Sequence, residues 1–466
     1  MLKEIPILIE NGAIVTDESS FKGDILIDEG KIKDIGSNLQ IPDSGVEIID
    51  ATDLYVFPGG IDAHVHMEKT AAPGIYSADN FESGTYAAVC GGTTSIIDFV
   101  TPNREQSLLE ALKERKEIAR KSLCDYGFHI AVTSWDENKA AEMKKCVEQE
   151  GIASFKIYLA YKDTIGLDDA AIIHVMDTAA ALKTPVIAHC ENSDLIHYLQ
   201  QKFLAKGKKS PKYHPLSRPP EAEKEAVVRA LVLAKITDCP LYIAHVSTRD
   251  AVTEIAAARE QGQRVFAETC PHYLLLDEKK YNMTGFASAA YVVNPPLRAG
   301  EHAAALWRAL KDEVIQVASS DHRSFNMKDR EKIAHHDFSK IPNGVPGVEN
   351  RLSLLYTYGV LQNRISINQF VEMTAAAPAR IFGLYPRKGT LKIGSDADIV
   401  VWDPTHKGII STKTHGYNCD NNIYEGFPIK GKPHVVICSG KIAYEDDIIR
   451  IEKGSGNYLS RETSFT

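Results

Sequence analysis

Two histidines separated by one residue end a predicted strand, in Gly60-Ile61-Asp62-Ala63-His64-Val65-His66. Side chains alternate along a strand, so His64 and His66 point to the same side. Both imidazoles can therefore reach one point beyond the strand, an arrangement that suits a metal ion. The ordinary alternative is that one histidine belongs to the core and the other to the surface. The pair by itself is weak evidence for a metal site.

Other side chains that can bind a metal stand on further predicted strands. Lys156 lies within one strand, His189 and His245 each end one, and Asp321 ends the last. Imidazoles and a carboxylate form a ligand set for zinc or a similar divalent ion. Any one of these residues is more often structural than catalytic. The four histidines and Asp321 all stand at the ends of predicted strands, which indicates one metal centre.

The segments that must position these residues alternate between strand and helix patterns after residue 55. The predicted strands are 56–66, 93–100, 126–134, 154–161, 185–190, 241–247, 264–270 and 315–321, with helical stretches between most of them. Eight such strands over about 325 residues predict a (β/α)8 TIM barrel, whose sites lie at the C-terminal ends of the strands. An open doubly wound sheet is the alternative. It is disfavoured because Gly91-Gly92 precedes a strand, whereas the phosphate-binding turn of that fold follows one.

Short strand-like segments with intervening turn residues occupy both ends of the chain. We predict that residues 1–55 and 384–455 form one small composite β-sandwich domain beside a barrel of residues 56–383. The polar residues 456–466 are predicted to form a C-terminal arm.

The composition is that of a globular protein of ordinary charge. The chain has 466 residues, of which 44% are hydrophobic and 25% charged, and its formal net charge is −9. This charge argues against a nucleic-acid partner, and no apolar run approaches the ~20 residues needed to cross a membrane. The eight cysteines are scattered, and the N-terminal residues do not form a signal peptide, so a cytoplasmic location is expected.

Lys156 is the unusual member of the candidate metal centre, because an ammonium group inside an apolar strand is costly. One interpretation is a buried ion pair with Glu191. The other is that burial favours the neutral amine, which then adds carbon dioxide to form a carbamate. The two carbamate oxygens could bridge two metals ~3.5–4 Å apart, a pair that activates water at neutral pH. The residues alone do not decide between these interpretations.

Several longer sequence motifs resemble those of a known protein family more specifically than the single residues do. They include Pro58–His66, Phe155–Lys162, Ser217-Arg218-Pro219-Pro220-Glu221, Asn294-Pro295-Pro296-Leu297-Arg298, Lys340-Ile341-Pro342-Asn343-Gly344, Pro378–Leu384 and Gly394–Asp398. Through these motifs nearly the whole chain resembles the dihydropyrimidinase/hydantoinase family of cyclic amidohydrolases, within the amidohydrolase superfamily. The resemblance implies a hydrolase of carbon–nitrogen bonds other than peptide bonds. Its small-molecule substrate would be a dihydropyrimidine, a hydantoin or a related cyclic ureide or imide, opened to an N-carbamoyl amino acid type of product.

The resemblance also implies a binuclear metal site and a homotetramer. One divalent metal ion, by default zinc, would be held by His64, His66 and Asp321, and a second by His189 and His245. N6-carboxylated Lys156 would bridge the two ions.

The same resemblance implies how the substrate is bound and opened. Tyr161 would donate a hydrogen bond to the developing oxyanion, and backbone groups at Asn294 and Asn343 would bind the amide edge of the ring. Asp321 would take a proton from the attacking water and deliver it to the leaving ring nitrogen.

The sequence departs from familiar hydantoinases around the substrate. Glu68 and Lys69 make the loop after His66 more charged than usual, and Arg323 stands near a position where a small thiol is common. Each of these three could be a solvated residue at the rim. Together they leave open a polar or anionic ring substituent. Asn294 replaces a common serine, a change that a backbone role tolerates.

Three alternatives remain at this stage. A dihydroorotase would be expected to carry an arginine at position 68 to bind the substrate carboxylate, whereas Glu68 would repel it. An allantoinase would share the same metal ligands. A non-catalytic scaffold is disfavoured because scaffold relatives have lost metal ligands that this chain keeps.

Overall fold

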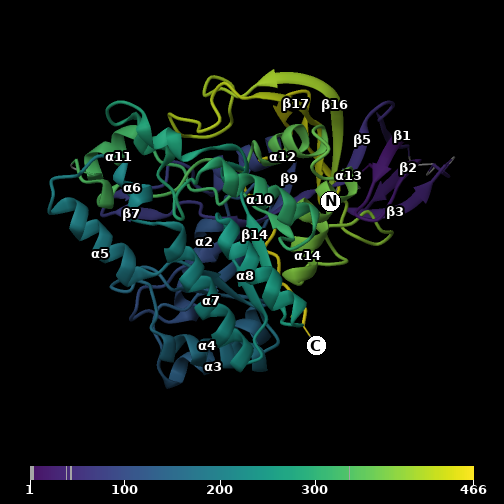
Figure 1. The fold of residues 1–466 in the computed structure, drawn as a ribbon. Helices are drawn as coiled ribbons and strands as arrows, with labels where there is room; N and C mark the ends of the chain where they lie inside the picture. The colour runs from purple at the N-terminus through teal and green to yellow at the C-terminus, as the bar shows by residue number, and fades with distance from the viewer. Residues whose placement is uncertain (1–4, 38, 42–44, 335, 466) are drawn as a thin grey trace.

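Eight parallel strands form the central sheet of the computed structural model, which describes residues 5–37, 39–41, 45–334 and 336–465 (Figure 1). In spatial order they are β6 (Gly60–Val65), β9 (Thr93–Val100), β10 (Asp125–Ala131), β11 (Phe155–Tyr158), β12 (Val186–His189), β13 (Leu241–Ile243), β14 (Val265–Thr269) and β15 (Val317–Ala318). A parallel bridge between Val65 and His322 joins the first strand to the segment after the last. The predicted (β/α)8 barrel is confirmed.

Helices follow most of these strands, and polar caps begin several of them. The longer ones are α1 (Phe81–Cys90), α2 (Leu108–Ala119), α3 (Glu137–Glu150), α4 (Asp169–Ala181), α5 (Ser193–Leu204), α7 (Pro220–Ile236), α8 (Arg249–Glu260), α10 (Gly300–Lys311) and α11 (Met327–Ala334). The side chains of Ser107, Asp136, Asp168 and Thr248 accept backbone N–H bonds at the starts of α2, α3, α4 and α8. Such caps satisfy N–H groups that have no partner within the helix.

Shorter helical elements lie mainly in the second half of the chain. They are α6 (Tyr213–Leu216), α9 (Pro271–Leu275), α12 (Arg351–Leu355), α13 (Ile367–Val371) and α14 (Ala377–Ile381), the 3₁₀ turns η1 (Glu278–Asn282), η2 (Ala287–Tyr291) and η3 (Phe338–Lys340), and the π turns η4 (Tyr356–Val360) and η5 (Glu372–Ala376). None of the helices in the described ranges is long and apolar enough to cross a membrane.

Strands from both ends of the chain form a second sheet. Its members are β1 (Ile7–Val15), β2 (Ser20–Asp28), β3 (Lys31–Gly36), β4 (Glu47–Asp50), β5 (Tyr55–Pro58), β16 (Ile399–Ile409), β17 (Pro428–Cys438), β18 (Lys441–Glu445) and β19 (Ile448–Ile449). The antiparallel pairing of β5 with β16 joins the two parts into one continuous sheet with a core of its own. In Figure 1, β1, β2 and β3 lie to one side of α3, α4 and α7.

The predicted strand 56–66 is divided between the two sheets. Its first part is β5 in the second sheet, and its second part is β6 in the barrel. Gly59 lies between them, where an added Cβ would come within 2.2 Å of the Thr94 hydroxyl oxygen. The chain therefore crosses from one sheet to the other at a residue that has no room for a side chain.

A buried arginine holds the closing seam of the barrel. Arg351 donates to the carbonyl of Ala318 on β15 at 3.0 Å and to the hydroxyl of Thr93 on β9 at 3.1 Å. Its Nε lies 3.6 Å from Asp62 on β6. Asp62 in turn accepts the N–H of Ser320 at 3.1 Å. This seam fixes the end of β6 beside the segment that follows β15.

The end of the chain covers the N-terminal mouth of the barrel. Leu459 joins the core formed by the inward-facing strand residues, and its N–H donates to the Tyr126 carbonyl at 2.7 Å. The guanidinium group of Arg461 donates to the carbonyls of Phe128 and Phe382. Residues 457–465 of the predicted arm thus pack against the barrel, and residue 466 lies outside the described chain.

Candidate metal centre

Six candidate ligands line one cavity of about 390 Å³ at the C-terminal end of the barrel. His64 lies on β6 and His66 directly follows it, Lys156 lies on β11, and His189 ends β12. His245 and Asp321 lie in the loops just after β13 and β15. Residues from five different strand ends therefore meet at the face where barrel enzymes carry their sites.

The first group of candidate ligands consists of His64, His66 and Asp321. The Nε2 atoms of the two histidines are 3.2 Å apart. They lie 3.3 and 3.4 Å from Oδ1 of Asp321. Three electron-pair donors thus face one small volume, as a metal ion requires.

The second group consists of His189 and His245. Nδ1 of His189 lies 2.9 Å from Nε2 of His245. His64, His245 and Asp321 can each offer a ligand atom, with all three atoms within 4.8 Å of one another. The two groups are therefore contiguous.

Lys156 does not form the ion pair with Glu191 that one interpretation of the sequence suggested. It is 1% exposed, and its Nζ has no hydrogen-bond partner in the described part of the chain. Glu191 instead accepts from Arg218 at 2.6 Å and contacts Nε2 of His189 at 2.9 Å. The Lys156 amine therefore remains without a carboxylate partner inside the cavity wall.

Two buried glutamates orient the histidines, a role that was not predicted for either of them. Glu268 on β14 contacts Nδ1 of His64, and Glu191 contacts Nε2 of His189, so the other ring nitrogen of each histidine faces the cavity. Carboxylate–histidine pairs of this kind fix the tautomer and orientation of metal-binding imidazoles. The position of Glu268 near the end of the predicted strand 264–270 was a signal that could have identified it.

The residues predicted to contact the substrate lie on the same cavity. Tyr161, Asn294 and Asn343 all line it. The Tyr161 hydroxyl accepts a bond from Nδ2 of Asn294 at 2.7 Å, which leaves its own proton available for another acceptor.

Two of the three charged residues that depart from familiar hydantoinases also line the cavity. Lys69 and Arg323 belong to its wall, whereas Glu68 does not. The Glu68 carboxylate lies 3.7 Å from Nζ of Lys121. Glu68 is thus paired with a lysine and is not among the residues that line the cavity, so its effect on a substrate carboxylate stays a prediction.

Three residues of the centre have left-handed backbone conformations. The φ angles are 59° at Tyr161, 39° at His245 and 49° at Asp321. Such conformations cost ~1–3 kcal/mol each for residues other than glycine and cluster at functional sites. The surrounding structure holds these side chains where an extended strand end would not place them.

Residues 55–443 match the amidohydrolase family. The chain belongs to the amidohydrolase family. It is 43% identical to a D-hydantoinase from Geobacillus stearothermophilus over 97% of this chain and 96% of the relative. It is 39% identical to a dihydropyrimidinase from Dictyostelium discoideum over 98% of this chain and 90% of the relative. The crystal structure of a dihydropyrimidinase from Brevibacillus agri NCHU1002 aligns with a TM-score of 0.97 and 42% identity, covering 98% of this chain and 99% of that one.

Membership of the amidohydrolase family, together with the donor group of the cavity, implies a divalent metal cofactor. Burial lowers the pKa of His66 and of His245 well below the usual value, and neighbouring imidazoles add to this. Both rings are therefore neutral, the form that binds a metal. Nδ1 of His66 and of His245 and Nζ of Lys156 also lack hydrogen-bond partners among the described residues. The donor set of this amidohydrolase fits a divalent metal.

A second group of acidic residues is explained without a metal. Asp125, Asp396 and Asp398 also offer oxygens within 4.8 Å of one another. The ammonium group of Lys388 lies among them, 2.7 Å from Asp125 and 3.1 Å from Asp396, and also bonds Asp398. This cluster joins β10 of the barrel to the start of β16, and the lysine supplies its positive charge.

Proposed function

We propose that the protein is a binuclear metal-dependent hydrolase that opens the cyclic amide of a dihydropyrimidine, a hydantoin or a related cyclic ureide or imide. The observation that carries this proposal is the meeting of four imidazoles, one carboxylate and a buried lysine in one cavity with Tyr161 on its wall. The D-hydantoinase and dihydropyrimidinase relatives, which match nearly the whole chain, support it.

The proposed metal ligands divide into two sets. His64, His66 and Asp321 would hold one ion, His189 and His245 the other, and N6-carboxylated Lys156 would lie between them, with zinc as the expected metal. Burial lowers the pKa of Lys156 to about 8, so a substantial fraction of the amine is neutral near pH 7–8 and can add carbon dioxide. The absence of any partner for its Nζ among the described residues supports this modification. When bound, the two ions would polarise the ring carbonyl and make water more acidic.

The side chains around the metals would bind the ring and move protons. Tyr161 would donate its hydroxyl proton to the carbonyl oxygen as negative charge develops there, while backbone groups at Asn294 and Asn343 hold the amide edge. Burial raises the pKa of Asp321 to about 6, which brings this carboxylate closer to the basicity that proton transfer at neutral pH requires. Asp321 would take the proton of the attacking water and give it to the leaving ring nitrogen.

The first prediction concerns the reaction itself. Purified protein should open dihydrouracil or hydantoin, with the open-chain product measured by chromatography, and removal of its metals by a chelator should abolish this activity until zinc is added. Allantoin and dihydroorotate belong in the same comparison. Turnover of allantoin alone would identify an allantoinase instead, and turnover of dihydroorotate alone would identify a dihydroorotase. Failure to open any ring by metal-loaded protein would contradict the proposal.

The second prediction concerns Lys156. The substitution Lys156→Ala should lower the metal content from about two ions per subunit to at most about one, because the bridging oxygens are lost. Elemental analysis of the purified variant measures this.

The matched control is Lys139→Met, which removes a lysine that is also buried but pairs with Glu142 at 3.3 Å on α3. This control should retain the full metal content. Two ions per subunit in Lys156→Ala would exclude the carbamate bridge.

The third prediction concerns Tyr161. The substitution Tyr161→Phe should lower kcat by ~10²–10³, because one donor to the oxyanion is lost, while metal content stays unchanged. Tyr158→Phe, which removes a second hydroxyl from the same cavity wall, should cost less. Near-normal kcat in Tyr161→Phe would show that another group stabilises the oxyanion.

The fourth prediction concerns assembly. We propose a homotetramer, which an exposed apolar stripe of Val228, Val232 and Ile236 on α7 supports, because such stripes mark contact surfaces. Light scattering should then give about four times the chain mass of 51.4 kDa. A particle with the mass of one chain would exclude the assembly.

A further inference from the structure

Two cationic side chains stand on the wall of the cavity, apart from the proposed metal ligands. Lys69 precedes the short hairpin of β7 (Thr70–Ala72) and β8 (Ile75–Tyr76), and Arg323 follows Asp321 by two residues. Both line the same cavity as the candidate ligands. We call this pair the cationic wall.

The cationic wall has no negative partner of its own. In the described chain no carboxylate oxygen forms an ion pair with either side chain, whereas Arg115, Arg218 and Arg298 each pair with a buried carboxylate. Charged groups removed from water are normally paired, because isolated burial is costly. The wall therefore carries no ion pair that a substrate anion would have to displace, as is also true of buried Arg330 and Arg461, whose partners among the described residues are backbone carbonyls.

Neutral groups satisfy the cationic wall only in part. Lys69 donates to the carbonyl of Phe99 at 3.3 Å and to the hydroxyl of Thr101. Arg323 donates to the carbonyl of Thr70 at 3.3 Å and to Oδ1 of Asn343 at 3.5 Å, and its buried Nε has no partner in the described chain. A guanidinium group has five N–H donors, so Arg323 retains donors for a further acceptor.

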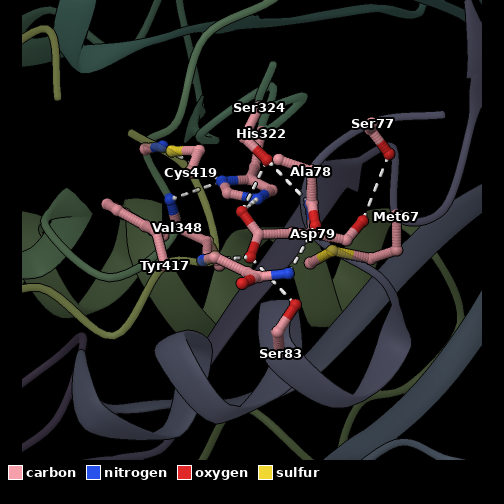
Figure 2. Close-up of polar contacts among 12 residues, drawn as sticks. Met67, Ser77, Ala78, Asp79, Ser83, His322, Ser324, Val348, Tyr417 and Cys419 are labelled. Carbon is pink, nitrogen blue, oxygen red and sulfur yellow. Dashed lines mark hydrogen bonds and ion pairs between the residues drawn. The ribbon is translucent and has the colours of Figure 1, made fainter. Parts of the chain in front are cut away.

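A buried network fixes the two segments that carry the wall (Figure 2). Asp79, at the end of the Lys69 loop, accepts from Ser324 at 2.5 Å and contacts Nε2 of His322 at 3.1 Å. The N–H of Gly347 donates to Nδ1 of His322 at 3.1 Å, so Nδ1 is an acceptor and the ring N–H lies on Nε2, where it donates to Asp79.

The same network continues on both sides of Asp79. The N–H of Ala78 donates to the Ser324 carbonyl at 2.9 Å, and Ser83 on α1 donates to Asp79 at 2.9 Å. The hydroxyl oxygen of Ser77 accepts a hydrogen bond from the backbone N–H of Lys69 at 2.9 Å. These bonds join the loop before α1, which carries Lys69, to the segment after β15, which carries Arg323. The two side chains are therefore held in place before a ligand binds, which lowers the entropic cost of binding.

We propose that the substrate carries a carboxylate outside its ring and that Arg323 and Lys69 bind this group. The inference rests on the proposed ring-opening function and specifies its substrate class. Arg323 offers the planar pair of donors that matches a carboxylate, and Lys69 adds a second positive charge beside it. Burial lowers the pKa of Lys69 to about 7, with Arg115 and Arg323 contributing, so a bound anion would favour the charged amine.

The competing explanation is that both cations only support the cavity wall through their bonds to Phe99, Thr70 and Asn343. In that case their removal would affect charged and neutral substrates alike. Two substrates of nearly equal shape separate these explanations, namely hydantoin-5-acetate and its uncharged amide, hydantoin-5-acetamide.

The fifth prediction is a selectivity for the charged member of this pair. Wild-type enzyme should show a kcat/KM for hydantoin-5-acetate at least about tenfold above that for the amide. The substitutions Arg323→Gln and Lys69→Met should each bring this ratio close to one. The measured quantity is the ratio of the two kcat/KM values of the same variant. A loss of activity that affects both substrates equally does not change this ratio.

Two control variants retain the wall while altering nearby charge. Glu68→Gln removes the charge of the residue beside Lys69 that contacts Lys121 outside the cavity, and Arg120→Gln removes an exposed arginine paired with Glu117. Both should keep the wild-type ratio, and metal content should be measured for every variant.

The outcomes are distinct. A wild-type ratio of one or below, with ring opening intact, would overturn the carboxylate assignment and leave the proposed function standing. A high ratio that survives both wall substitutions would also overturn it. Opening of neither compound, nor of hydantoin or dihydrouracil, would instead contradict the proposed function. If Arg323→Gln does not fold, Lys69→Met and the wild-type ratio still decide the assignment.

Discussion

The closure of the barrel is the constraint on which the candidate metal centre depends. His64 and His66 come from the first barrel strand, and Asp321 comes from the loop after the last. These groups meet only because Asp62 binds the Ser320 N–H and Arg351 spans the seam. The N–H of His66 also donates to the His322 carbonyl at 2.8 Å, just beyond the candidate ligands. A slip of one residue at the Val65–His322 bridge, which joins β6 to the segment after β15, would reverse the side-chain directions and separate the donors.

Burial sets the protonation equilibria of the candidate metal centre. It lowers the pKa of His66, His189 and His245 and raises the pKa of Asp321, while the low-dielectric surroundings strengthen the pairs His64–Glu268 and His189–Glu191. Burial alone would raise the pKa of Glu191, yet Arg218 and His189 lower it to about 2, so this glutamate remains an anion that orients His189. The donors are therefore arranged before any ion arrives, and the cost of arranging them is met during folding.

The residues proposed to select the substrate lie on different elements from the candidate metal ligands. The ligands lie on or just after barrel strands, whereas Lys69 and Arg323 lie in connecting segments that the Asp79 network fixes to each other (Figure 2). Loops can change without disturbing a barrel, which is why one fold supports many substrates. The cationic wall lies on segments of this kind, beside a barrel whose fold matches those of dihydropyrimidinase and D-hydantoinase crystal structures.

The sequence alone determined the barrel, the composite second sheet and the strands on which the candidate ligands stand, because strand and helix periodicities and long motifs are local properties of the chain. It could not show that Glu191 pairs with Arg218 and not Lys156, that Glu268 orients His64, or that Glu68 lies beside Lys121. The split of the predicted strand 56–66 at Gly59 was not predicted, although Pro58-Gly59-Gly60 is a combination typical of turns. These features depend on which distant segments pack together and which way a loop residue turns. Only the tertiary structure decides contacts between residues far apart in the chain.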